Sequence, residues 1–365
     1  MSDNSFRFKA IHKTLSRLFG FPEGNPARRL KVLALMINGI IGSGHVSLSK
    51  IVDHECKNTD AQSKVKQKTR FLQNDQVTFE AFYLPYISAF LAGLSKGGEL
   101  VFSIDGSTVG RGCMCLMISV KYKKRAIPVV WLVVEGKKGH LPEALHLALL
   151  QRLAEFVPEG CRCVLLGDGE FDGCDLQQQL QNLKWEYVLR TSSNILISSD
   201  CQEQFKLQHL DPGKEAHIFI EHVQFSARRF GPVNVLVWQG RKYEAPLYLV
   251  TNMDHGPQAC KYYKWRFLIE TLFSDQKSRG FHIHKSHMSS PQRLERLLIA
   301  TCIAYVWIIL MGIKCVDSRD MAKVHRKDRC DLSMFTLGIR YLKFLINNRK
   351  LRRFGTFPGE EKSVR

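Results

Sequence analysis

Apolar and polar positions recur along the chain with two different spacings. From residue 27 to about 94 the apolar residues have helical spacing, interrupted by a polar break at residues 57–59. From residue 100 onward, short apolar runs typical of strands alternate with helical patterns. The predicted strands are 100–105, 113–122, 127–134, 163–166 and 185–190, and the predicted helices among them are 142–156 and about 175–183. This order is typical of a mixed α/β domain.

A second group of strands follows the first. Predicted strands near residues 217–225, 233–238 and 246–251 lie in an all-β segment from about 195 to 252, and helical patterns return from about residue 260. We therefore expect an α/β domain interrupted by an all-β insertion. The predicted regions are a helical domain at 1–98, the interrupted α/β domain at 99–313 and a basic helical tail at 314–365.

The apolar run at residues 297–313 needs a membrane check, because its 17 residues without a charge reach the lower length limit for a span. It continues a helical pattern that carries Arg293, Glu295 and Arg296, so we predict a buried core helix. The first 13 residues carry charges and have no apolar core, unlike a secretory signal. We expect a cytoplasmic protein that contacts no membrane.

The charge of the chain is unevenly distributed. There are 53 Lys and Arg against 34 Asp and Glu, and the net charge of +19 makes a polyanion the first partner to consider. Residues 1–98 carry a net +7 and residues 314–365 a net +8, whereas the long middle carries only +4. Basic flanks around a nearly balanced middle are expected if the flanks bind phosphates and the middle performs chemistry.

The N-terminal flank contains a candidate helix-turn-helix. A helix at Ser47–Glu55, a turn at Lys57–Thr59 and a second helix at Asp60–Leu72 fit that motif. A pair of solvated helices with surface lysines is the plainer alternative. On the second helix, the side chains that we assign to DNA phosphates are Lys64, Lys68 and Arg70.

The cysteines and histidines do not indicate a metal site. The 11 cysteines are odd in number and include no Cys-x-x-Cys pair, so we expect neither a disulfide framework nor a zinc site. His282, His284 and His287 lie among basic residues, which favours a position facing DNA or a role in a turn over metal ligation.

Two predicted strands each lead into an aspartate followed by glycine, Asp105 after the first and Asp168 after the fourth. An acid next to a buried strand must be solvated, paired or bound to a cation, because burying it bare is costly. A helix cap or a turn is the plainer explanation for either acid alone. Two such acids make a shared metal site more attractive, since carboxylates suit Mg2+.

A third acid lies in the segment from Tyr263 to Lys277. At about 100° per residue, a continuous helix places Tyr263, Arg266, Glu270 and Lys277 within about a 60° wedge of one face. A solvated face with a Glu270–Arg266 pair is the alternative. One acid, two cations and a phenol on one face can equally bind a metal and hold a phosphodiester.

The spacing of these four residues, Tyr263-x2-Arg266-x3-Glu270-x6-Lys277, matches the YREK signature. On this motif the chain resembles DDE transposases of the "four" family of bacterial insertion sequences. The resemblance covers roughly residues 104–309 and implies a ribonuclease H-like fold, with the β insertion before the helix that carries the glutamate.

The two aspartate tracts also resemble that family's first and second acid motifs. Gly169 stands where a basic residue is common in the family, which leaves Asp172 as an alternative second acid. The resemblance implies a catalytic triad of Asp105, Asp168 and Glu270 that holds two Mg2+ ions, for which Mn2+ can substitute. Two divalent ions can activate water or a 3′-OH and stabilise the leaving oxygen.

The resemblance further implies partners and an activity. Tyr263, Arg266 and Lys277 would hold the DNA backbone near the cut, and Trp238 could stack a flipped base, although a packed strand tryptophan is the plainer explanation. The implied partners are double-stranded DNA, as terminal inverted repeats and target, and a second copy of the chain in a homodimer. The expected function is transposition, and the rivals are a metal-dependent nuclease or resolvase and a non-catalytic DNA-binding repressor.

Overall fold

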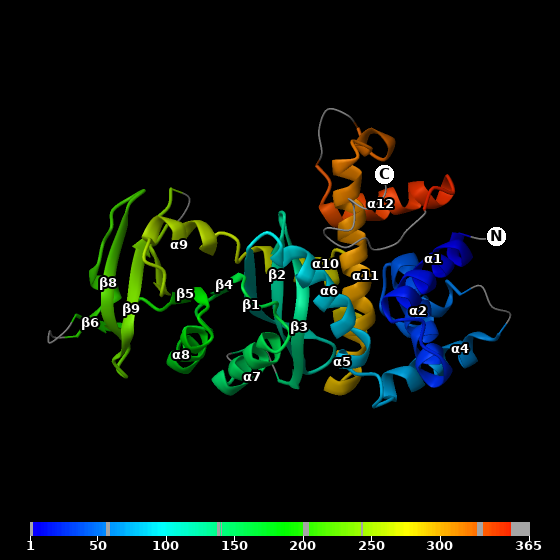
Figure 1. The fold of residues 1–365 in the computed structure, drawn as a ribbon, viewed down its shortest axis with the longest axis horizontal. Helices are drawn as coiled ribbons and strands as arrows, with labels where there is room; N and C mark the ends of the chain where they lie inside the picture. Colours follow the sequence, from blue (N-terminus) through cyan, green and yellow to red (C-terminus); the bar gives the residue numbers. More distant parts are fainter. Residues whose placement is uncertain are drawn as a thin grey trace.

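The computed structural model describes residues 3–55, 59–136, 139, 141–199, 204–241, 244–326 and 331–351. Figure 1 shows an elongated molecule with the N-terminal helices at one end and the strands of the insertion at the other. The long helix α11 (Pro291–Asp317) stands between the N-terminal helices and the central strands.

Five strands form the core half of the sheet, and they fall within a few residues of the predicted ones. The first three strands along the chain pair in antiparallel fashion. The fourth strand pairs in parallel with the first strand on one side and with the fifth on the other. This mixed arrangement is that of a ribonuclease H-like core, and the predicted fold class is confirmed. The strands are β1 (Glu99–Val109), β2 (Cys113–Tyr122), β3 (Arg125–Glu135), β4 (Arg162–Gly167) and β5 (Glu186–Thr191).

The insertion extends this same sheet, because its last strand pairs antiparallel with β5. The described strands thus make one sheet of ten, in the order β3-β2-β1-β4-β5-β10-β9-β8-β6-β7. The added strands are β6 (Leu196–Ser198), β7 (Phe205–Lys206), β8 (His217–Phe225), β9 (Phe230–Trp238) and β10 (Leu247–Thr251).

Helices cover both faces of the central strands. Because side chains alternate along a strand, Val101 and Val164 pack on one face with Tyr262 of α9 (Gly256–Tyr263). Their neighbours Phe102 and Leu165 belong to a second cluster that contains the apolar side chains of α7 (Glu143–Ala154) and α8 (Cys174–Asn182). A short helix, α10 (Leu268–Gln276), follows α9.

The N-terminal region is helical as predicted. Its helices α3 and α4 correspond to the predicted helix pair, although Lys57 in the predicted turn lies outside the described residues. Asp60 is the N-cap of α4, and its side chain accepts a hydrogen bond of 2.8 Å from the Ser63 backbone N–H. The helices are α1 (Asp3–Leu18), α2 (Gly24–Ser43), α3 (Leu48–Val52), α4 (Ala61–Gln73), α5 (Phe79–Phe82) and α6 (Leu84–Ser95).

The assignment of Lys68 to DNA is wrong. Its side chain is 0% exposed and forms an ion pair with the equally buried Glu55. The reason is its place on the helix, three and four residues before the buried Phe71 and Leu72, which puts it on the apolar face of α4. Lys64 is half-buried and Arg70 is exposed.

The predicted core helix at 297–313 is confirmed. Among the described residues α11 alone is long and apolar enough to cross a membrane, and 94% of its most apolar window is buried inside the protein. It packs on β3, on α2 and on α12 (Met334–Asn347). At Gly338 of α12, an added Cβ would lie 2.0 Å from the Ile308 carbonyl oxygen, so glycine permits the close approach to α11.

Candidate active site

Asp105 lies inside β1, where the sheet opens. We predicted that the strand ends at this residue, but β1 continues to Val109 because β2 pairs with it in antiparallel fashion, Asp105 opposite Met117. The pairing of β1 with β4, in contrast, ends at Ser103 opposite Leu166. Asp105 therefore lies just beyond the last parallel pair, at an edge that can receive a ligand.

Asp168 follows β4 by one residue, and the register places it beside Asp105. Ser103 pairs with Leu166, so Asp105 and Asp168 are each two residues further along adjacent parallel strands. Two-residue spacing also puts both on the face of Val101 and Val164, which α9 covers. Each carboxylate accepts a local backbone hydrogen bond, Asp105 from Gly106 N–H at 2.7 Å and Asp168 from Glu170 N–H at 3.1 Å.

The segment with the third acid is not one helix. Helix α9 ends at Tyr263, a turn occupies residues 264–267, and α10 begins at Leu268. Lys277 lies just after α10, with φ −97° and ψ −116°, outside the helical region. The predicted 60° wedge therefore does not describe this segment. Glu270 lies in the first turn of α10.

Arg266, in the turn between the two helices, brings the three acids together. Its Nη1 lies 3.9 Å from Asp105 Oδ2 and 3.7 Å from Asp168 Oδ2, and its Nη2 donates a hydrogen bond to Glu270 Oε1. The Arg266 side chain is only 8% exposed, whereas that of Glu270 is 52% exposed. The three carboxylates predicted to form the triad thus surround one guanidinium group.

The electrostatics of Asp105 reflect this crowding. Burial first, and then the charges of Asp168 and Glu270, raise the pKa of Asp105 to about 7, although Arg266 and the Gly106 hydrogen bond oppose the rise. One guanidinium does not compensate three carboxylates in a partly buried site. The donor set therefore fits hard divalent cations, which prefer carboxylate oxygens.

In this structure the three acids are spaced around a guanidinium group and not around a metal ion. Among the residues that the structure describes, no three His, Cys, Asp or Glu side chains are close enough together to hold a metal ion. Arg266 lies between the carboxylates. Its Nε is buried without a hydrogen-bond partner, so the fork of the guanidinium is only partly engaged.

Of the two remaining signature residues, one bonds to the strand that carries Asp105 and the other lies in the core. The Lys277 Nζ donates a 3.2 Å hydrogen bond to Thr108 Oγ1, three residues beyond Asp105 on β1. Tyr263, in contrast, is 1% exposed and packs among Val101 and its neighbours. A direct contact of Tyr263 with the DNA backbone, which we expected, is not compatible with this burial.

The alternative second acid, Asp172, is engaged elsewhere. Its Oδ2 accepts a 2.6 Å hydrogen bond from Thr191 Oγ1 at the end of β5, and its carbonyl accepts one of 2.7 Å from the Gln177 side chain. The geometry favours Asp168 as the second acid, because it is Asp168 that lies near Arg266.

Trp238 lies at the same edge of the sheet as the acids. It ends β9, which runs parallel to β5 because both are antiparallel to β10. It packs against the apolar cluster on the face of the two aspartates, and Lys264 Nζ lies 5.1 Å from its ring centroid. Three strand spacings separate β9 from β4, a distance of about 14 Å.

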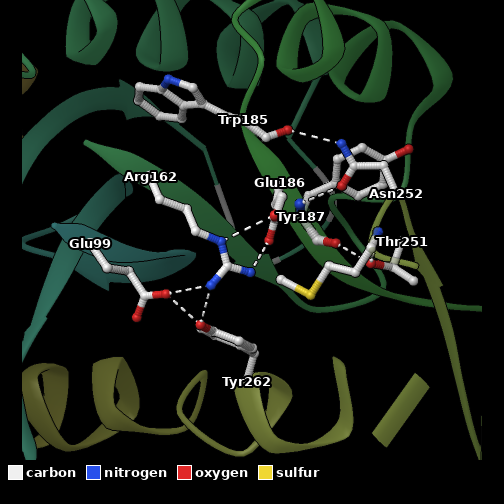
Figure 2. Close-up of polar contacts among 9 residues, drawn as sticks. Glu99, Arg162, Trp185, Glu186, Tyr187, Thr251, Asn252 and Tyr262 are labelled. Carbon is white, nitrogen blue, oxygen red and sulfur yellow. Dashed lines mark hydrogen bonds and ion pairs between the residues drawn. The ribbon is translucent and has the colours of Figure 1, made fainter. Parts of the chain in front are cut away.

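The opposite edge of the sheet holds a polar cluster that sequence reasoning missed (Figure 2). Arg162, which begins β4, bonds to Glu99 of β1 at 2.7 Å, to Glu186 of β5 at 3.1 Å and to the Tyr262 hydroxyl of α9 at 2.8 Å. The signal was available, since the three charged residues each begin one of three adjacent parallel strands. The cluster ties α9, and with it the turn that carries Arg266, to the sheet.

The chain was compared with known families and with solved structures. The profile of the family "Transposase DDE domain" matches residues 96–307. Among solved structures, the chain is similar to a piggyBac transposase in a synaptic complex with hairpin DNA, with 13% identity and a TM-score of 0.48, over 95% of this chain and 79% of that one. It is similar to human ENDOV with 15% identity and a TM-score of 0.27, over 61% of this chain and 96% of that one. No curated protein sequence matches.

The family match covers more than half of the chain and includes both aspartates, Glu270 and the insertion. Proteins of this family generally use divalent metal ions. From the match and the arrangement of the acids, this chain belongs to the DDE transposase family.

Proposed function

We propose that this transposase binds the ends of an insertion sequence of the "four" family, cleaves the DNA and joins the 3′-OH to a target. The observation that carries the proposal is the convergence of Asp105, Asp168 and Glu270 on one guanidinium at the open edge of the sheet. Strand transfer distinguishes this activity from that of a nuclease or resolvase, and the intact triad argues against a non-catalytic repressor.

The three carboxylates would hold two Mg2+ ions, or Mn2+ in their place. When bound, such ions activate water or a 3′-OH and stabilise the leaving oxygen. The chain's own residues then position the DNA. Lys277, which bonds to Thr108 of the strand that carries Asp105, would bind a phosphate of the DNA. Trp238 would stack a base drawn out of the duplex, and its position at the same edge of the sheet supports this role.

Binding of the element ends is assigned to residues 1–98, where the net charge is +7. Lys64, which is half-buried, and Arg70, which is exposed, remain candidate phosphate contacts, and the exposed Lys66 of α4 takes the place of Lys68. We further propose a catalytic domain from residue 99 to the end of α11, a basic tail after it, a homodimer in the DNA complex and a cytoplasmic location. The boundary after residue 313 falls inside α11, which ends at Asp317.

The decisive experiment replaces each acid and separates chemistry from DNA binding. Asp105→Asn, Asp168→Asn and Glu270→Gln should each lower Mg2+-dependent cleavage and strand transfer by at least about 100-fold, because each removes a ligand where geometry sets the rate. Binding to end DNA, measured by gel shift, should persist, because phosphate contacts rest on Lys and Arg side chains.

Asp172→Asn is the matched control, since it makes the same chemical change four residues away. It should retain cleavage if its fold is intact. An inactive Asp172→Asn together with an active Asp168→Asn would reassign the second acid. Normal cleavage by all three triad variants would reject the mechanism, and cleavage without strand transfer in the native chain would favour the nuclease.

A further inference from the structure

Arg266 occupies a position that its backbone fixes. Its amide N–H donates to the Tyr263 carbonyl at 3.0 Å, and its own carbonyl accepts from Ile269 N–H at 3.3 Å. The turn is thus bonded to both flanking helices, and α9 is anchored to the sheet by the Arg162 cluster. The side chain can reorient while its backbone stays in place.

The hold of the acids on the guanidinium is unequal. Only Glu270 accepts a hydrogen bond from it, because the closest contacts to the two aspartates, 3.7 and 3.9 Å, exceed hydrogen-bond distance. The Nε has no partner, and the guanidinium lies 4.5 Å from the ring centroid of Phe267, which is 38% exposed. Glu270 and Phe267 are the most exposed contacts of Arg266, so they lie on the solvent side of its guanidinium group.

A guanidinium and a divalent ion cannot share this space. Mg2+ requires carboxylate oxygens at about 2.0–2.1 Å. The Arg266 nitrogen between the two aspartates keeps their oxygens at nearly twice that distance from itself, and no metal-sized cluster exists among the described acids. For the acids to close around a metal, the guanidinium has to leave.

We propose that Arg266 is a resident counter-ion that competes with divalent cations for Asp105, Asp168 and Glu270 and is released toward DNA when they bind. It balances part of the acidic charge before metal arrives, and metal binding frees its fork for a phosphate. Metal loading and phosphate binding are then coupled through one side chain. This inference rests on the proposed function, since it takes the triad as the metal site.

Calorimetric titration of the full chain with MnCl2, without DNA, tests the competition. Arg266→Gln should bind Mn2+ about tenfold more tightly than the native chain, because it removes the competitor. Its melting temperature in EDTA should fall, because three carboxylates lose their partner, and Mn2+ should raise it by more than it raises that of the native chain.

Lys277→Gln is the matched control, because it removes a positive charge of another signature residue, whose side chain donates a hydrogen bond to Thr108 of β1. A general electrostatic effect would tighten Mn2+ binding equally in both variants and would overturn the proposal. The proposal would also be overturned if Arg266→Gln bound Mn2+ no more tightly than the native chain does.

Asp105→Asn separates the two hypotheses. If this variant binds Mn2+ as the native chain does, the triad is not the metal site and the proposed function fails. If it loses Mn2+ binding while Arg266→Gln binds as the native chain does, only the counter-ion inference fails. Should Arg266→Gln not fold, Arg266→Lys replaces it, and tighter Mn2+ binding is again expected, since one ammonium cannot bridge three carboxylates as the fork does.

Discussion

Acidic residues of this protein lie in two different environments. The carboxylates around Arg266 lie at an open edge of the sheet and face a positive charge. Asp275 of α10 lies in the interior, 1% exposed, with Oδ2 lacking a hydrogen-bond partner. Its burial raises the pKa of its carboxyl to about 6, despite the nearby positive charges of Arg125 and Arg279. Asp275 therefore costs stability when it ionises.

We predict a pH dependence of stability from Asp275. Its pKa is higher in the folded state than in the unfolded chain, so the folded state retains the proton longer and stability falls as the pH rises from about 4 to about 6. In the Asp275→Asn variant, the free energy of unfolding should not show this part of the decline between pH 4 and pH 6. Urea unfolding at pH 4 and pH 7 measures it, and an unchanged pH profile in the variant would contradict the prediction.

We predict that Lys68→Met destabilises the N-terminal helices by about 3–5 kcal/mol, because it leaves the buried Glu55 carboxylate without its partner. The double variant Lys68→Met, Glu55→Leu should regain most of the loss, since an apolar pair can replace a buried ion pair. Chemical denaturation of the two single variants and the double variant gives the coupling energy. A mild loss in the single variant with weaker DNA binding would restore Lys68 as a phosphate contact.

At the level of elements, a basic seam joins α3 to the loop after α10. We define it by His45, Lys50, His282, His284 and Lys285. The His45 and His282 rings stack with centroids 5.2 Å apart, and burial, Lys50 and the other members lower the pKa of His45 to about 4. The loop also lies beside the β1–β2 turn, where Arg111 N–H donates to the Met288 carbonyl at 2.7 Å. The seam therefore lies near the acid edge of the sheet.

We predict that Lys50→Gln with Lys285→Gln weakens binding to end DNA and lowers the salt slope of the affinity by about 2, since both side chains are exposed and each would release a counter-ion. The matched control is Lys96→Gln with Lys184→Gln. This pair removes two exposed charges just before the amino ends of β1 and β5, at the other edge of the sheet from the acids. The control should bind as the native chain does. Equal losses in both pairs would show that net charge alone matters.

The elements differ in how far sequence could predict them. Strands such as 113–122 were predicted because a buried strand is a continuous apolar run bounded by charges or turns. The break at 264–267 was not predicted, because no glycine or proline marks it and its apolar and polar residues continue a helical pattern. The burial of Lys68 could have been read from its spacing to Phe71 and Leu72.

At the scale of the whole molecule, α11 holds the parts together. Its apolar middle is buried, with contacts to the N-terminal helices, the core sheet and α12. The motif spacing identified the acids, but no local pattern could reveal that the insertion extends the core sheet, since strand pairing between β5 and β10 joins residues about sixty positions apart.

We predict that the N-terminal helices and the catalytic core unfold together. Trp307 lies near the middle of α11 and is 0% exposed. The substitution Trp307→Ala should lower the free energy of unfolding by about 3–5 kcal/mol. Fluorescence and circular dichroism should give coincident transitions in urea for the native chain. Two separated transitions would show that α11 does not couple the regions.

The continuity of the sheet restricts how the protein can admit DNA. Four residue pairs join β5 to β10, and Asn252 bridges the same junction through the Trp185 carbonyl at 2.9 Å and the Tyr187 amide at 2.9 Å (Figure 2). The insertion and the acid edge therefore move as one rigid body, and the insertion cannot swing as a lid.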